Sequence, residues 1–343
     1  MIIQLNHNST ETQKQELLKK LESLHTYYKW VEAKNLIVLP KLNDSAFLKN
    51  ESCIEYITET DTPYQLASIQ FKEHTSFNVK GATISKQSFQ MIAGPCSIET
   101  ESQIEETAAF LASLGIKFIR GGAYKPRTSP YSFRGLGLDG LKLIRKAADK
   151  YDLRVVTEIM DLSLLDEVYE YTDILQVGSR NMHNFSLLDE LGKIDKPILL
   201  KRGMHARVNE WLLAAEYILS GGNDKVILCE RGIRSFDNAT RNVMDVGVIP
   251  LIKELSHLPV IADPSHGTGQ ASRVEALSLA AVAAGANGLL IEVHPNPSKA
   301  LSDAYQAVSF DNFKSIASKV EAIRECLKSF SSDQESVLKL QSF

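Results

Sequence analysis

The first eighty residues contain no glycine, although the chain of 343 residues has 19. All of these glycines lie at Gly81 or later, so the tight turns and close backbone contacts that require glycine are confined to the rest of the chain. A break this sharp indicates two structural units. We expect a small N-terminal unit at 1–62, a linker at 63–76, a larger unit at 77–330 and a polar tail at 331–343.

Other absences narrow the class of protein. Only four cysteines are present, none in CxxC spacing, which argues against a disulfide framework and favours a reducing cytoplasm. A formal net charge of −4 gives no sign of a nucleic-acid or membrane surface. The N-terminus lacks the basic and apolar segments of a signal peptide. The longest apolar stretch, 276–291, is broken at 285–288 and is typical of a buried helix followed by a strand.

The N-terminal unit has the pattern of a ferredoxin-like module. IIQL predicts a strand, and leucines recurring at helical spacing predict a helix over 9–24, with Ser9 or Thr10 as its cap. A hairpin from YYKWVEA and NLIVLP, a short helix over 45–49 and the strand CIEYITE complete the order β-α-β-β-α-β.

After a small hairpin, FNVKGATI, which we expect to close the bottom of a barrel, strands and helices alternate eight times. An α/β chain of eight such units predicts a (β/α)8 barrel with parallel strands. The strands are expected at 89–96, 118–124, 154–159, 174–179, 197–202, 225–230, 259–265 and 288–293. The helices are expected at 101–114, 139–151, 162–171, 185–191, 208–219, 239–255, 272–284 and 311–330.

Potential metal ligands lie at or just beyond the ends of strands one, seven and eight. They are Cys96, His266, Glu292 and Asp303. These strands become neighbours when a barrel closes, so a thiolate, an imidazole and two carboxylates would meet at one end. That donor set suits a divalent transition metal, without choosing among Mn, Fe, Co and Zn.

The other strand ends carry an arc of positive charge. Arg120, Lys125, Arg127, Arg180, Lys201, Arg202 and Arg231 end or follow the second, fourth, fifth and sixth strands. Any one of these residues alone has an ordinary structural explanation. Charge at nearly every buried strand end has no such structural explanation, because buried charges are rare without a partner. So many cations predict substrates that together carry two phosphates and a carboxylate.

Eight motifs together resemble one enzyme family. AGPCSIE, RGGAYKPRTSPYSFRGLG, TEIMD, QVGSRNMHNFSLL, LLKRGM, LCERGIRSF, ADPSHGTG and IEVHPNPSKALSDAYQ are similar to 3-deoxy-D-arabino-heptulosonate 7-phosphate (DAHP) synthases, in particular to the short bacterial and archaeal type I beta subgroup. The resemblance runs from about Pro63 to Phe310. It implies a metal-dependent condensation of phosphoenolpyruvate with erythrose 4-phosphate, the first step of the shikimate pathway towards chorismate and aromatic amino acids.

The resemblance also implies roles for individual residues. Phosphoenolpyruvate would be held by Arg120, Lys125, Arg180, Lys201 and Arg231, and erythrose 4-phosphate by Arg127, Thr128 and Asp263. Cys96 and His266 would act as ligands of the catalytic metal, and Lys125 would move a proton near the aldehyde. Whether the metal activates the aldehyde or a water stays open.

Alternative functions also stay open. 3-Deoxy-D-manno-octulosonate 8-phosphate synthase shares the barrel, but it has an Asn-containing run in place of the Lys-Pro-Arg-Thr at 125–128. A non-catalytic amino-acid-sensing subunit is the third interpretation. In the matching subgroup the N-terminal domain binds tyrosine or phenylalanine, so feedback by one of them is implied; the alternative for this unit is packing or oligomerisation. A homotetramer or homodimer is implied as well.

Overall fold

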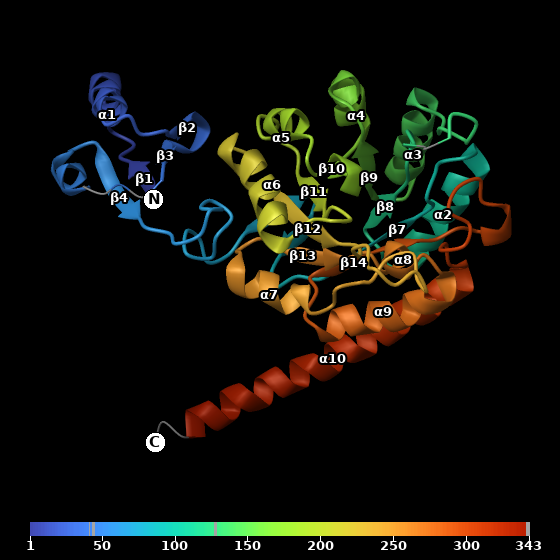
Figure 1. The fold of residues 1–343 in the computed structure, drawn as a ribbon. Coiled ribbons are helices and arrows are strands. Elements are labelled where there is room, and N and C mark those ends of the chain that lie inside the picture. The colour runs from blue at the N-terminus through green and yellow to red at the C-terminus, as the bar shows by residue number, and fades with distance from the viewer. Residues whose placement is uncertain (41, 43–44, 127–128, 341–343) are drawn as a thin grey trace.

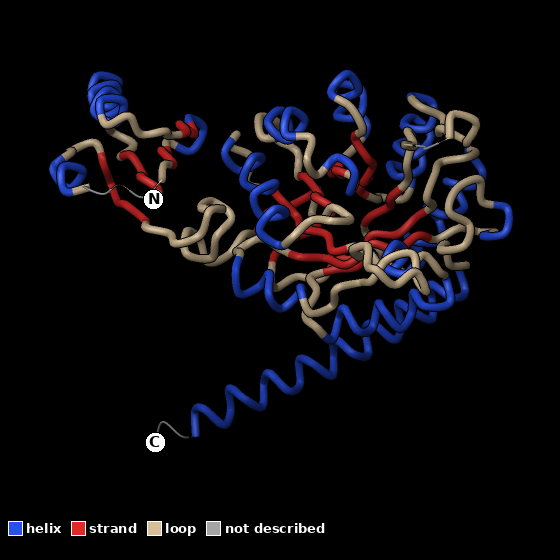
Figure 2. The backbone as a smooth tube through the Cα atoms, viewed as in Figure 1, coloured by secondary structure: helices blue, strands red, loops and turns tan. Residues whose placement is uncertain are grey.

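The computed structural model describes residues 1–40, 42, 45–126 and 129–340, and the side chains among them up to residue 330. Eight parallel strands close into a barrel in the order β10-β11-β12-β13-β14-β7-β8-β9 (Figures 1 and 2). Their bounds are β7 Gln90–Gly94, β8 Phe118–Arg120, β9 Arg154–Ile159, β10 Ile174–Val177, β11 Ile198–Lys201, β12 Val226–Glu230, β13 Val260–Ala262 and β14 Gly288–Glu292. The predicted barrel is therefore confirmed, and strands one, seven and eight are neighbours.

Helices follow the strands and surround the barrel. They are α2 Glu101–Ser113, α3 Leu138–Lys150, α4 Leu165–Tyr171, α5 Phe185–Leu191, α6 Val208–Ser220, α7 Val248–Leu255, α8 Pro264–Thr268, α9 Ala271–Ala283 and α10 Phe310–Leu340. Single turns of 3-10 helix lie at η3 Leu162–Leu164, η4 Ser179–Asn181 and η5 Pro297–Lys299. Helix α10 continues past residue 330 and projects from the barrel in Figure 1. In the described part of the chain, no helix is both long enough and apolar enough to cross a membrane.

The sequence-based helix at 239–255 is wrong at its start. Helix α7 begins at Val248, and the residues between β12 and α7 form a long loop. Tertiary contacts hold this loop away from helical geometry: Ile233 and Val243 form an antiparallel bridge. The Asp245 side chain then accepts a hydrogen bond from the amide of Val248, 3.2 Å away, which defines the helix start. This loop consequently belongs to the open end of the barrel.

A two-stranded hairpin closes the other end, as predicted. Strands β5 (Ser76–Val79) and β6 (Ala82–Ser85) pair antiparallel. Val79, Ala82 and Ile84 pack in one buried cluster with side chains that point into the barrel, including Phe118 and Leu199. The hairpin therefore extends the barrel core and keeps water out from below.

The N-terminal unit has the predicted ferredoxin-like topology. Strands β1 (Ile2–Leu5), β2 (Lys29–Val31), β3 (Leu36–Val38) and β4 (Ile54–Thr58) form one sheet in the order β2-β3-β1-β4. Helix α1 (Glu11–Ser23) begins with a capping box in which Thr10 and Gln13 exchange hydrogen bonds. The second helix of the module is reduced to a 3-10 turn, η2 (Ala46–Asn50), and another turn, η1 (Glu32–Lys34), connects β2 to β3.

The N-terminal unit and the following linker pack against the barrel on the side of helix α6. Glu216 of α6 accepts hydrogen bonds from the linker amides of Leu66 and Ala67, at 2.8 and 2.9 Å. Lys34 pairs with Asp224 at 2.8 Å across the contact. The N-terminal unit thus stands beside the barrel, on the side of α6 (Figure 1).

Candidate active site

Three potential metal ligands from distant parts of the chain meet at the carboxyl ends of β7 and β14. Single ligand atoms of Cys96, Glu292 and Asp303 all lie within 4.8 Å of one another. Cys96 follows β7, Glu292 ends β14, and Asp303 lies in the loop after β14. The Sγ atom of Cys96 donates a hydrogen bond to Oδ2 of Asp303 at 3.0 Å. Burial, together with the nearby Glu292, raises the pKa of the Cys96 thiol to about 12.

His266 approaches the same cluster from a short helix. Asp263 caps α8 through a hydrogen bond from the amide of His266, and Pro264 occupies the first turn. This places His266 Nε2 3.7 Å from Oε1 of Glu292 and Nδ1 2.7 Å from Oδ2 of Asp263. Burial holds the pKa of His266 below its ordinary value, although Asp263 opposes the shift. The neutral imidazole favoured in this way is the form that binds metals.

Glu292 is fully buried, and each of its oxygens has a polar neighbour. Oε1 lies 3.2 Å from Nη1 of Arg120, and Oε2 accepts a hydrogen bond from Gln306 Nε2 at 2.7 Å. Burial alone would raise the pKa of Glu292, but His266 and Arg120 bring it below its ordinary value. The side chain therefore remains a carboxylate, the form that can bind a cation.

Lys125 lies against Cys96. Its Nζ atom is 3.1 Å from Sγ of Cys96 and 3.0 Å from the Cys96 carbonyl oxygen. Burial lowers the pKa of Lys125, but Cys96 and Glu292 outweigh this, so the net shift is upward. Lys125 thus remains an ammonium ion that can donate a proton.

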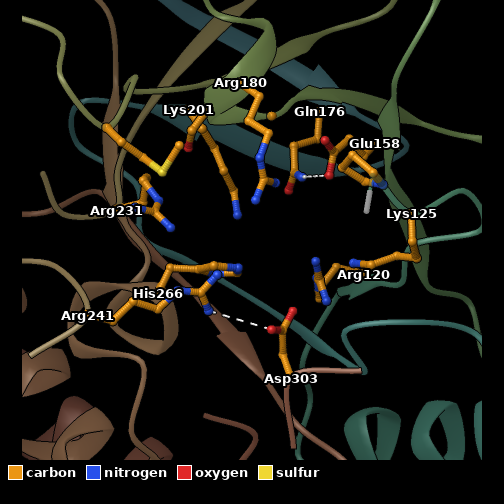
Figure 3. Close-up of a pocket in the computed structure, with 14 residues that line it drawn as sticks. Arg120, Lys125, Glu158, Gln176, Arg180, Lys201, Arg231, Arg241, His266 and Asp303 are labelled. Carbon is orange, nitrogen blue, oxygen red and sulfur yellow. Dashed lines mark hydrogen bonds and ion pairs between the residues drawn. The ribbon is translucent and has the colours of Figure 1, made fainter. Parts of the chain in front are cut away.

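Asp303 of the cluster and the adjacent His266 line a cationic cavity (Figure 3). Its lining includes Arg120, Lys125, Arg180, Lys201 and Arg231, the five residues that the resemblance assigns to phosphoenolpyruvate. Among the described residues, the Nε atoms of Arg120 and Arg231 are buried without a hydrogen-bond partner. Buried donors of this kind are normally satisfied, so these two indicate an anion that completes the site.

Of the three residues predicted to hold erythrose 4-phosphate, Asp263 lies within the described part of the chain. Arg127 and Thr128 lie outside the described residues. Asp263 is fully buried, and its Oδ2 atom lies 2.6 Å from Nζ of Lys201 as well as close to His266. In this arrangement the Asp263 carboxylate contacts Lys201 and His266, two other residues of the candidate site.

Several lining residues were not singled out from the sequence. Arg241 lines the cavity, as do Glu158 and Gln176 at the ends of β9 and β10. Gln176 Nε2 donates to Oε2 of Glu158 at 3.3 Å (Figure 3). Arg241 was missed because its segment was counted as helix. The run CERGIRSFDNATRN could have signalled a loop, since it places several residues that favour turns between the strand and α7.

Comparisons with known proteins place this chain among related enzymes. A family model described as the DAHP synthetase I family matches residues 71–329. A phospho-2-dehydro-3-deoxyheptonate aldolase from Thermotoga maritima is 45% identical over 95% of this chain and 98% of its own. A 2-dehydro-3-deoxyphosphooctonate aldolase from Francisella tularensis is 31% identical over 70% of this chain and 93% of its own.

Solved structures show the same likeness. A crystal structure of a Thermotoga maritima DAHP synthase superimposes with a TM-score of 0.77 at 43% identity, covering 95% of this chain and 97% of that one. A truncated form of the 3-deoxy-D-arabino-heptulosonate 7-phosphate synthase from the same organism gives a TM-score of 0.73 at 46% identity, covering 77% of this chain and 97% of its own.

Proposed function

This chain belongs to the DAHP synthetase I family, and we propose that it condenses phosphoenolpyruvate with erythrose 4-phosphate to form DAHP and phosphate. A bond forms between C3 of phosphoenolpyruvate and the aldehyde carbon, water adds at C2, and inorganic phosphate leaves. One observation carries the proposal: the cluster of Cys96, Glu292 and Asp303 meets, at Asp303, a cavity lined by five predicted phosphoenolpyruvate contacts.

The donor set of this cluster fits a divalent metal ion. Cys96, His266, Glu292 and Asp303 offer a sulfur, a ring nitrogen and two carboxylates, and the two carboxyl groups have pKa values below their ordinary range. The proton on the Cys96 thiol would be lost on binding. A bound metal would supply Lewis acidity to a carbonyl or water oxygen. We infer no metal identity from this set.

The remaining residues bind and orient the substrates. The free Nε donors of Arg120 and Arg231 support a bound carboxylate or phosphate. Two anionic substrates repel each other, and the cationic lining offsets that repulsion while bringing the reacting carbons together. The Lys125 ammonium is our proposed proton donor near the aldehyde, because it contacts Cys96 of the cluster and stands two residues before Arg127 in the sequence.

A second candidate is the octulosonate-phosphate synthase reaction, which uses arabinose 5-phosphate as the aldehyde. The likeness to the Francisella protein supports it, but the higher identity and the coverage of both domains favour the first reaction. The Lys-Pro-Arg-Thr run at 125–128 favours it as well.

The test is phosphate release from phosphoenolpyruvate by full-length protein, with each aldehyde in turn. We expect turnover with erythrose 4-phosphate, little with arabinose 5-phosphate, and loss of turnover after treatment with a chelator that a divalent metal reverses. Preference for arabinose 5-phosphate would assign the second reaction. No turnover with either aldehyde at full metal occupancy would favour a non-catalytic subunit.

Regulation, assembly and location are further proposals. We propose that the N-terminal unit mediates feedback by tyrosine or phenylalanine; unchanged rates with both would leave it a packing or oligomerisation module. We expect a homotetramer or homodimer, which light scattering would measure. Four free cysteines support a cytoplasmic location.

A further inference from the structure

We propose that Gln306 and Arg241 form a bridge that holds the two carboxylates of the metal site, Glu292 and Asp303, in the positions a cation requires. The proposal rests on the proposed metal site, and it assigns positioning roles to two residues for which the resemblance implies no role. Neither residue ends a barrel strand. Arg241 comes from the β12–α7 loop and Gln306 from the segment before α10.

Gln306 has a fixed orientation. Its side chain is buried, its Nε2 atom donates to Oε2 of Glu292 at 2.7 Å, and its Oε1 atom accepts from Nη1 of Arg241 at 3.0 Å. Both ends of the amide are therefore used. Rotating the amide by 180° would place its nitrogen against the Arg241 guanidinium and its oxygen against the Glu292 carboxylate. The contact with Arg241 therefore determines which end of the amide faces Glu292.

Arg241 completes the connection. The same Nη1 atom lies 3.5 Å from Oδ1 of Asp303, a contact drawn in Figure 3. Asp303 Oδ2 contacts Cys96, so Arg241 approaches the other oxygen of this carboxylate. A continuous path thus runs from Glu292 through Gln306 and Arg241 to Asp303. It joins the end of β14 to the loop beyond it through a residue from a third element.

The same loop also contacts the helix that carries His266. Nδ2 of Asn242 donates to the carbonyl oxygen of His266 at 2.9 Å, and the backbone amide of Arg241 donates to the carbonyl oxygen of Thr268 at 3.3 Å. A Cβ atom at Gly269 would lie 2.9 Å from the Arg241 side chain, so glycine keeps space for it. Contacts with the α8 segment therefore hold the loop that carries Arg241 in place.

Two physical effects of Arg241 oppose each other, which makes the proposal testable. Its positive charge repels a cation, so charge alone predicts tighter metal binding when Arg241 is removed. Its hydrogen bond orients Gln306, and residues that orient metal ligands contribute about 10- to 100-fold to affinity. The bridge instead predicts weaker metal binding when Arg241 is removed. Nearly half of the Arg241 side chain is exposed, and water screens its charge, so we expect orientation to dominate.

The experiment titrates Co²⁺ into metal-free full-length protein and follows the absorption band of the cobalt–thiolate bond. Three variants are compared with the parent: Gln306→Leu, Arg241→Met and the double variant. Arg273→Met is the matched control, because Arg273 forms the same kind of hydrogen bond, to Gln270, on the exposed start of α9. Thermal unfolding of each metal-free variant reports whether the fold is intact.

We expect the dissociation constant for Co²⁺ to rise about 10- to 100-fold in Gln306→Leu, to rise in Arg241→Met, and to be unchanged in Arg273→Met. The double variant should lose little more than Gln306→Leu, because both residues act through one path. Binding by Gln306→Leu within twofold of the parent, or tighter binding by Arg241→Met, would overturn the bridge. So would a double variant whose loss is the product of the single losses. A parent protein that binds no Co²⁺ would overturn the metal site itself and the bridge with it.

Discussion

The Nζ atom of Lys125 lies 3.1 Å from the Sγ atom of Cys96. A residue predicted to contact substrate therefore touches a residue predicted to hold the metal, although they come from different strands. The ammonium opposes the upward shift that burial gives the pKa of the Cys96 thiol but does not overcome it, while the pKa of Lys125 itself is raised. The contact therefore joins a proposed metal ligand directly to a proposed substrate contact.

Replacing Lys125 by methionine should lower kcat by about 10²- to 10⁴-fold, because a positioned proton donor contributes that much. Methionine keeps most of the side-chain volume, so the fold should be retained. Steady-state kinetics at full metal occupancy provide the measurement, with the exposed Lys117→Met as control. Normal turnover of Lys125→Met would rule out the proton-transfer role.

Replacing Cys96 by serine should abolish most metal affinity and activity. A serine hydroxyl is a hard, neutral donor, whereas the thiolate is soft and charged. Co²⁺ titration should show no thiolate band and a much weaker association, while Cys326→Ser, at an exposed cysteine, should bind like the parent. Undiminished affinity in Cys96→Ser would remove Cys96 from the ligand set.

The variant Asp263→Asn distinguishes two roles for this residue. Asp263 Oδ2 lies 2.6 Å from Lys201 and 2.7 Å from His266, and all three side chains are largely buried. Losing one partner of such a pair costs about 3–5 kcal/mol of stability. Denaturant unfolding should show this loss, with the exposed Asp139→Asn as control. A raised KM for the aldehyde with unchanged stability would instead support the predicted contact with a sugar hydroxyl.

The pH dependence of stability should reveal His257, a buried residue that does not line the candidate active site. His257 is buried between Thr75 Oγ1 and the Leu66 carbonyl oxygen, both 2.6 Å away, and burial lowers its pKa to about 4. The folded protein then binds fewer protons here than the unfolded chain between pH 4 and the ordinary pKa of 6.5. The free energy of unfolding that depends on neutral His257 is therefore fully present above this window and decreases as the pH falls through it.

Thermal unfolding at about pH 7.5, above that window, and at about pH 5, within it, compares the parent with His257→Gln. Glutamine can donate to Leu66 and does not titrate. The parent should therefore lose more stability than the variant on acidification. Parallel losses in the two proteins would show that His257 does not titrate as described.

The hairpin at the bottom of the barrel should contribute strongly to stability. Ile84 is buried in the cluster that contains Phe118 and Leu199. Ile84→Ala should cost about 2–5 kcal/mol, because it removes buried carbons and leaves a cavity. Denaturant unfolding measures the difference, and Thr83→Ala on the exposed face of the same strand should cost much less. Equal losses would mean that the hairpin does not close the core.

Local patterns predicted the elements that depend on local chemistry. Apolar runs located all eight barrel strands, and helix α5 was predicted to its exact bounds because its apolar positions recur regularly. The start of α7 was missed because the contacts that hold the preceding loop come from distant residues. One example is Arg202, whose Nη1 atom lies 3.0 Å from Oδ2 of Asp245. Helix α8 was counted as the end of a strand, although the pair Asp263-Pro264 is a helix-start signal.

The sequence by itself determined the alternation of strands and helices, and so the barrel and the end at which functional residues gather. Strand order then brought Cys96, Glu292 and Asp303 together, as expected from residues that follow neighbouring strands. Only the tertiary structure decided which side chains orient these groups. Gln306 and Arg241 reach the site from loops, and loop paths depend on contacts with the whole scaffold, which no local pattern encodes.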